Sequence, residues 1–168
     1  DLVEFWGGLE TALDEAMQSL IGMRESEGMR LERDLIHRID RIAQFINDIS
    51  KQEPLVVTSY RDRLAQRIKE MISESLVEES RLATEVAIFA ERSSITEELV
   101  RINSHLLQFQ RIIKAAEPVG RKLDFLIQEL HREINTIGSK ANDTVISHLV
   151  VEVKGELEKI REQLQNVE

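Results

Sequence analysis

Apolar residues recur at intervals of three and four along much of the chain, and this spacing constrains the fold more than any other feature. One such run joins Leu31 to Ile49, and another starts at Ile95 and reaches Ile113. Residues three and four apart share one face of an α-helix, so each run predicts a helix that buries a single stripe. Aromatic residues are only 4% of the chain, with seven glycines and two prolines, too few for a sandwich or barrel. The sequence therefore predicts an all-α fold of five to six long helices in an extended hairpin or bundle.

Local signals predict where these helices begin and end. Pro54 should break the first long helix, with Ser59 capping the next one. Ser94 followed by Glu97 has the spacing of a capping box, and Gly138 is a natural stop. The predicted helices span residues 9–51, 60–72, 79–90, 95–116, 119–137 and 144–166. Residues 1–92 are expected to form a long coiled-coil-like hairpin, and residues 93–168 the helices that bear the motifs.

The balance of charge narrows the classes of function. The 168 residues carry a net charge of −9. They include no cysteine, and this excludes disulfides and thiolate zinc sites. An acidic chain can handle nucleic acid only through local basic residues or bound metal ions. No apolar run approaches the roughly 18 residues of a membrane span, and no signal-peptide pattern opens the chain. We therefore expect a cytoplasmic protein without a membrane partner, and the absence of an initial methionine suggests a fragment or a trimmed chain.

The segment from Gly120 to Asp143 carries an unusual set of polar side chains. Opposite its buried stripe, one helical band holds the residues Arg121, Asp124, Gln128, Arg132 and Asn135. Glu129 and Glu133 are one turn apart and can share a hard divalent cation such as Mg²⁺ or Mn²⁺. Arginine can clamp a phosphate through two hydrogen bonds. The alternative is ordinary surface pairing, for example between Glu129 and Lys122 or Arg132.

A second polar group lies on the preceding helix. Glu98, Arg101 and His105 have the spacing of one helical face, and histidine can transfer protons near neutral pH. A lone histidine is nevertheless more often structural or simply exposed. The chain contains no HExxH, P-loop, GxGxxG or GxSxG motif. Phe109 and Phe125 have core spacing and are interpreted as packing residues rather than base-stacking platforms.

Two long segments, "ERSSITEELVRINSHLLQF" and "GRKLDFLIQELHREINTIGSKANDTVISHLVVEVKGELEKIREQLQNVE", closely resemble the C-terminal half of the YicC/YloC family of bacterial proteins. The segment "MRESEGMRLERDL" resembles another family motif further upstream. The resemblance implies a metal-dependent endoribonuclease that hydrolyses RNA, in single-stranded or loop regions, during RNA degradation. It also implies a ring-like homo-oligomer, expected to be a hexamer, and an N-terminal domain that this chain lacks. His131 stands where the family pattern more often has asparagine.

The matching positions supply the candidate site residues. The resemblance implies acid, base or nucleophile-activating roles for four residues: Glu98, His105, Glu129 and Glu133. It implies divalent-metal ligation (Mn²⁺ or Mg²⁺) by Glu129, Glu133 and Asp143. The candidate RNA-binding residues are Arg101, Arg121, Lys122, Gln128, Arg132, Asn135 and Lys140, with Arg24, Glu25 and Glu27 as a weaker addition.

Two hypotheses of function follow. In the first, a bound cation reverses the local sign of the carboxylate-rich site, so that an acidic protein can act on polyanionic RNA. In the second, the chain is a non-catalytic helical module that oligomerises or binds RNA or protein. The long apolar stripes and the surplus of surface charge support the second hypothesis.

Overall fold

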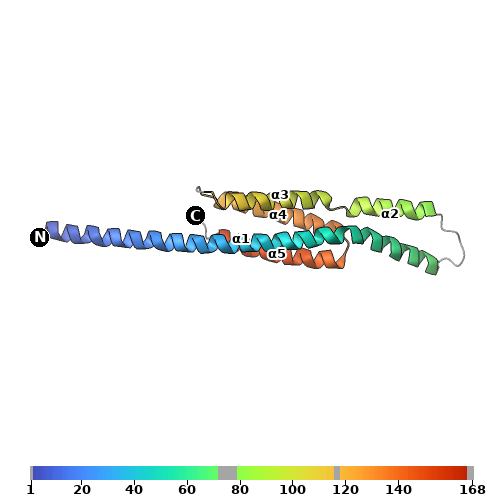
Figure 1. The fold of residues 1–168 in the computed structure, drawn as a ribbon, viewed down its shortest axis with the longest axis horizontal. Helices are drawn as coiled ribbons and strands as arrows, with labels where there is room; N and C mark the ends of the chain where they lie inside the picture. The colour runs from blue at the N-terminus through green and yellow to red at the C-terminus, as the bar shows by residue number, and fades with distance from the viewer. Residues whose placement is uncertain (1, 72–78, 116–117, 166–168) are drawn as a thin grey trace. The chain divides into compact units, whose positions relative to one another are not determined.

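The computed structural model describes residues 2–71, 79–115 and 118–165, and Figure 1 shows that these segments are almost entirely helical. The helices are α1 (Leu2–Met71), α2 (Glu79–Ser93), α3 (Thr96–Ile112), α4 (Gly120–Lys140) and α5 (Thr144–Leu164). No strand occurs among the described residues, which confirms the predicted all-α class. The chain divides into two compact units, one ending at His37 and the other beginning at Arg38.

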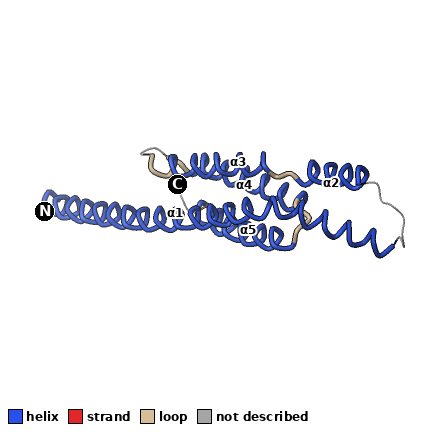
Figure 2. Tube along the Cα trace, turned by 45° about the vertical axis from the view of Figure 1, so that its right-hand side comes forward, coloured by secondary structure: helices blue, strands red, loops and turns tan. Residues whose placement is uncertain are grey.

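The larger unit contains a helical bundle. In Figures 1 and 2, its part of α1 lies beside α3 and α5, α4 packs against α3 and α5, and each helix runs opposite to the neighbours named here. The amide of Gln110 on α3 donates to Asp40 Oδ1 of α1 at 2.9 Å, and Arg38 Nη1 lies 2.9 Å from Glu156 Oε2 of α5. The apolar stripes predicted for α3, α4 and α5 form the core, with Ile102, Phe109, Ile127, Ile134 and Leu157 at most 1% exposed. Burial of each such side chain contributes about 1.5–3 kcal/mol.

The predicted break at Pro54 is wrong, because α1 continues through it to Met71. The segments predicted as two helices are therefore one, and the predicted helix count is slightly too high. A proline inside a helix removes one backbone hydrogen bond and costs about 3 kcal/mol. Ile49 and Val56 are buried on either side of Pro54, so tertiary packing holds the helix together across it. Ser59, the predicted N-cap, lies inside α1.

The start of α3 is capped from another helix rather than by its own sequence. Its N-cap residue is Ile95, and no side chain of the local segment forms the cap. Instead, Glu53 Oε1 of α1 accepts hydrogen bonds from the Ile95 amide at 3.2 Å and from Thr96 Oγ1 at 2.9 Å. The predicted capping box of Ser94 and Glu97 is therefore wrong, since Glu53 takes the place that Ser94 was expected to fill.

The end of α4 also differs from the prediction. The helix passes Gly138 and ends at Lys140, and Asn142 then adopts a left-handed backbone with φ of 43°. Asparagine tolerates this conformation better than most residues. A Cβ at Gly138 would lie 3.2 Å from Val150 Cγ1 of α5, so glycine here permits the close approach of two helices. Gly138 thus serves packing and not helix termination.

In the smaller unit, the part of α1 up to His37 carries exposed apolar side chains. Leu13, Met17 and Leu20 have the spacing of a buried helical stripe, but they are 62%, 51% and 48% exposed. In the described structure, a Cβ at Gly22 or Gly28 would meet nothing within 4 Å, so close packing does not require glycine at either position. None of the described helices combines the length and apolar character that a membrane span requires.

Candidate functional site

Glu98, in the first turn of α3, is a buried carboxylate held by two cations. It is 3% exposed, with Lys140 Nζ of α4 at 2.9 Å and Arg101 Nη2 at 3.2 Å from its Oε1. Burial alone would raise the pKa of Glu98, but the Lys140 hydrogen bond, a backbone hydrogen bond and the charges of Lys140 and Arg101 outweigh it. The pKa therefore lies below its ordinary value, and Glu98 is ionised at neutral pH.

Arg101 joins α3 to α4 through a second buried carboxylate. Its Nη2 lies 2.9 Å from Glu133 Oε2, and its Nη1 lies 3.4 Å from Glu97 Oε2. Glu133, predicted as a metal ligand, is only 4% exposed. The hydrogen bond to Glu133 raises the pKa of Arg101 despite some desolvation. This buried ion-pair network of Glu98, Arg101, Glu133 and Lys140 fixes the direction of the Arg101 side chain.

An open cleft of about 540 Å³ lies beside the network, between α3 and α4. It is lined by Arg101, Ser104, His105, Glu129, Arg132, Glu133 and Thr136. His105 is half-buried, and its Nδ1 has no hydrogen-bond partner among the described residues. Arg132 Nη1 lies 3.7 Å from Glu129 Oε2, so the Glu129 carboxylate is only loosely held. The cleft thus brings a histidine, two carboxylates and two arginines to one place.

The three predicted metal ligands do not form a preassembled site within one chain. Asp143 caps α5, where its Oδ1 accepts a hydrogen bond from the Ile146 amide at 3.0 Å. Glu133 is held by Arg101, and Glu129 lines the cleft. Throughout the described ranges, no three Asp, Glu or His side chains come close enough to hold a metal ion. The donor set among the described residues does not by itself fit a resident metal.

Residues 49–168 match the family described as "Endoribonuclease YicC-like, C-terminal". The chain belongs to this family. It is also similar to a protein of Clostridioides difficile (strain 630) named "Probable endoribonuclease YicC", with 50% identity over 164 residues. That alignment covers 97% of this chain and 56% of the relative.

A YicC-like relative from Haemophilus influenzae (strain ATCC 51907 / DSM 11121 / KW20 / Rd) carries the same name, "Probable endoribonuclease YicC". It is 38% identical over 160 residues, covering 95% of this chain and 55% of the relative. This YicC-like chain therefore spans slightly more than half the length of either relative.

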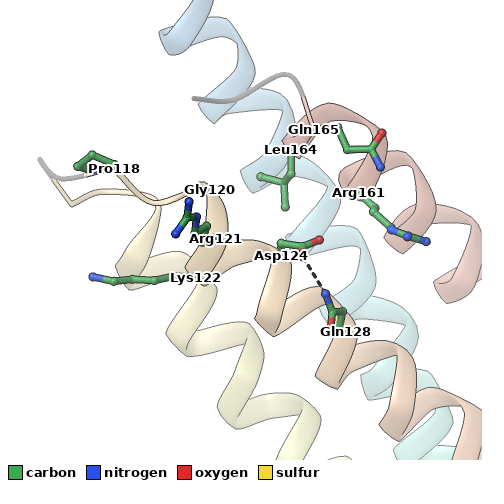
Figure 3. A pocket seen from close by; sticks show the side chains of 9 residues that line it. All are labelled: Pro118, Gly120, Arg121, Lys122, Asp124, Gln128, Arg161, Leu164 and Gln165. Atoms are coloured by element: carbon green, nitrogen blue, oxygen red, sulfur yellow. Dashed lines mark hydrogen bonds between the residues drawn. The ribbon is translucent and has the colours of Figure 1, made fainter.

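The predicted RNA-binding residues of this YicC-like chain divide among several cavities on α4. Arg121, Lys122 and Gln128 line a cavity of about 890 Å³ together with Arg161 of α5 (Figure 3). In that view, Gln128 donates a hydrogen bond to Asp124 Oδ2, and the distance is 2.7 Å. Arg132 and Asn135 line another cavity with His131, and Arg132 also reaches the cleft. Lys140 and Arg101 belong to the buried ion-pair network.

His131 lines the cavity that contains Arg132, next to Glu158 and Arg161. Burial lowers its pKa, and the charges of Arg161 and Lys154 lower it further against the opposing effect of Glu158. The histidine is therefore neutral at pH 7. Its Nε2 lies 3.8 Å from Glu158 Oε2, beyond hydrogen-bond distance.

Sequence reasoning missed some residues of these cavities and misjudged another. Ser104 and Thr136 line the cleft, and Thr136 follows Arg132 by one helical turn, which a wheel could have revealed. Arg161 approaches α4 from a distant helix, and no local pattern marks it. The prediction that Phe125 packs in the core is wrong, since it is 60% exposed while its neighbours Leu123 and Leu126 are buried. Phe109, in contrast, is fully buried as predicted.

Proposed function

We propose that this chain forms the catalytic region of an endoribonuclease that hydrolyses RNA in single-stranded or loop regions as part of RNA degradation. The observation that carries the proposal is the cleft in which His105 and Glu129 lie together with Arg101 and Arg132. The names of the two relatives support RNA as the substrate. Unpaired RNA is favoured because folded A-form helices hide their base edges from side chains.

Hydrolysis requires two proton transfers, and the cleft offers two groups for them. One group removes a proton from the water whose oxygen bonds to phosphorus. The other donates a proton to the ribose oxygen that leaves when its bond to phosphorus breaks. We assign these transfers to His105 and Glu129, because both line the cleft and neither is held by a close ion pair.

The arginines stabilise the charge that develops on the phosphate oxygens. Arg101 has five N–H donors and three carboxylate partners, which leaves two N–H groups for a phosphate. Arg132 is 74% exposed at its side chain and can follow the RNA backbone. Glu98 and Glu133 are positioning residues in this proposal, since they fix Arg101 before substrate binds.

Dependence on Mn²⁺ or Mg²⁺ remains a proposal that stems from the sequence. Of the three predicted ligands, Glu129 is the most available, and Mg²⁺ is commonly bound through one or two carboxylates together with substrate phosphates. A metal at the cleft would therefore need ligands from the RNA or from beyond the described residues.

The test is cleavage of a fluorescently labelled single-stranded RNA by the purified protein and by two variants, His105→Asn and Glu129→Gln. Loss of an acid or base should lower kcat by roughly 100- to 10,000-fold. His148→Asn and Glu152→Gln are matched controls on exposed positions of α5, and they should cleave normally. Cleavage by both cleft variants at the wild-type rate would remove the cleft from the mechanism. Absence of cleavage by the wild-type protein would refute the activity itself.

A second candidate function, helical oligomerisation, is favoured by the exposed apolar side chains of α1. Trp6, Leu13 and Met17 are each at least half exposed in the smaller unit, and exposed apolar patches are typical of association surfaces. We propose that this face joins copies of the chain into the expected homo-oligomer, predicted as a hexameric ring. Light scattering after size-exclusion chromatography should show Leu13→Glu to reduce the mass, and an unchanged mass would exclude this face.

A further inference from the structure

Phe125 is an aromatic side chain of α4 that is not buried in the core. It is 60% exposed and lines an open cavity of about 360 Å³ together with Gln108 and Ile112 of α3. Arg121 and Lys122 line the same cavity, and they precede Phe125 by four and three residues. Side chains at these spacings are neighbours on a helix surface. An exposed aromatic ring and two cationic side chains of α4 therefore line the same cavity.

This cavity lies next to the catalytic cleft on the same side of α4. Phe125 precedes Glu129 by four residues, which corresponds to a rise of about 6 Å along the helix. It precedes Arg132 by seven residues, or two helical turns, so Phe125, Glu129 and Arg132 follow one stripe. The two cavities are also adjacent along α3, since Gln108 of the Phe125 cavity is one helical turn from Ser104 of the cleft.

We propose that Phe125 is a base-stacking platform for a nucleotide next to the one cleaved, with Arg121 contacting its phosphate. This inference rests on the proposed ribonuclease function and adds the subsite that holds the strand. Proteins that bind single-stranded nucleic acid combine aromatic rings with cations, because every base has a π-face and every nucleotide a phosphate. No described carboxylate forms an ion pair with Arg121, so its guanidinium is available.

The ligand of this subsite is an unpaired strand of RNA. In a duplex both faces of each base are already stacked, so a single exposed ring gains nothing from it. Arg121 and Lys122 would still attract the phosphates of a duplex. The effect of Phe125 should therefore depend on whether the RNA is single-stranded, whereas the effect of Arg121 should not.

The experiment measures RNA binding separately from cleavage. Fluorescence anisotropy with a labelled single-stranded RNA is recorded for the His105→Asn protein, in which we expect cleavage to be slowed. Adding Phe125→Ala should weaken binding by about 5- to 100-fold. Phe125→Trp should retain binding, and Phe125→Leu should lose it, because leucine is apolar but has no π-face. Arg121→Ala should lower the salt-dependence slope of log K by about 0.7.

Three controls separate stacking from other roles of the ring. Leu107→Ala removes an apolar side chain of α3 that is 56% exposed, and it should leave RNA binding unchanged. A duplex of the same sequence should bind equally to the Phe125→Ala and parent proteins. Thermal unfolding and mass in solution should also be equal, because Phe125 is exposed.

The outcomes separate this inference from the proposed function. If Phe125→Leu binds single-stranded RNA as tightly as the parent, or if Phe125→Ala changes the oligomer mass and not RNA affinity, the stacking platform is refuted. The His105→Asn defect in cleavage would then still support the catalytic cleft. Conversely, normal cleavage by both His105→Asn and Glu129→Gln, together with weak RNA binding by Phe125→Ala, would support the subsite and refute the catalytic role of the cleft.

Discussion

Replacing Pro54 by alanine should stabilise the protein, because α1 continues through this position. At residue 54 a proline has no N–H to donate to the carbonyl one turn back, at Ser50, and its ring crowds that carbonyl. Alanine restores the donor and removes the crowding. Pro54 is itself exposed, so the exchange removes no buried contact.

The magnitude follows from two opposing effects. A proline in a helix interior costs about 3 kcal/mol relative to alanine. Proline also restricts the unfolded chain, and losing that restriction costs about 0.4–1 kcal/mol. The net gain is about 2 kcal/mol, which for a domain of this size raises Tm by about 4–8 °C.

Thermal unfolding followed by far-ultraviolet circular dichroism measures this gain. Pro118→Ala is the matched control, since Pro118 precedes α4 and lies outside any helix. Its replacement should leave stability unchanged or lower it slightly through the unfolded-chain effect alone. If Pro54→Ala left Tm unchanged or lowered it, α1 would not be one continuous helix, and the helix break predicted at Pro54 would be supported.

Other predictions concern the buried charges, the inter-helix cap and the metal. Glu156 is 2% exposed and contacts three partly exposed cations, so Glu156→Ala should cost about 1.5–3 kcal/mol in urea unfolding, whereas the exposed Glu152→Ala should be nearly neutral. Burial raises the pKa of Glu98 and of Glu156, but hydrogen bonds from neighbouring cations lower each below its ordinary 4.5. The stabilisation that these two carboxylates give the folded protein is therefore present above about pH 4.5, and it is lost as the pH falls through their lower pKa values in the folded state. In an acid titration, the free energy of unfolding of the variant with both residues replaced by Gln should fall less steeply with pH. Glu53→Ala should cost about 1 kcal/mol by removing the cap of α3, whereas Ser94→Ala should be nearly neutral; the reverse order in chemical denaturation would restore the predicted local cap. If a metal binds through Glu129 and the RNA phosphates, as proposed from the family resemblance, chelation should lower RNA cleavage and Mn²⁺ should restore it; full activity after exhaustive chelation would refute metal dependence.

Within the candidate site, the sequence indicated most residue types but not their roles. The spacing of Glu98, Arg101 and His105 predicted one polar helical face, and the contact between Glu98 and Arg101 is present. Burial of Glu98 and Glu133 could not be predicted, because a glutamate is expected at the surface unless its cationic partners are known. Those partners come from another helix: Lys140 for Glu98, and Arg101 for Glu133.

The sequence by itself determined the helical class and the buried stripes of the last three helices, because a repeat of three and four is a property of one helix. Only the tertiary structure decided that α1 crosses Pro54, that Glu53 caps α3 and that Phe125 faces solvent. Each of these depends on what a neighbouring helix supplies or leaves uncovered. A helical period specifies a face, but it does not specify whether another helix covers that face.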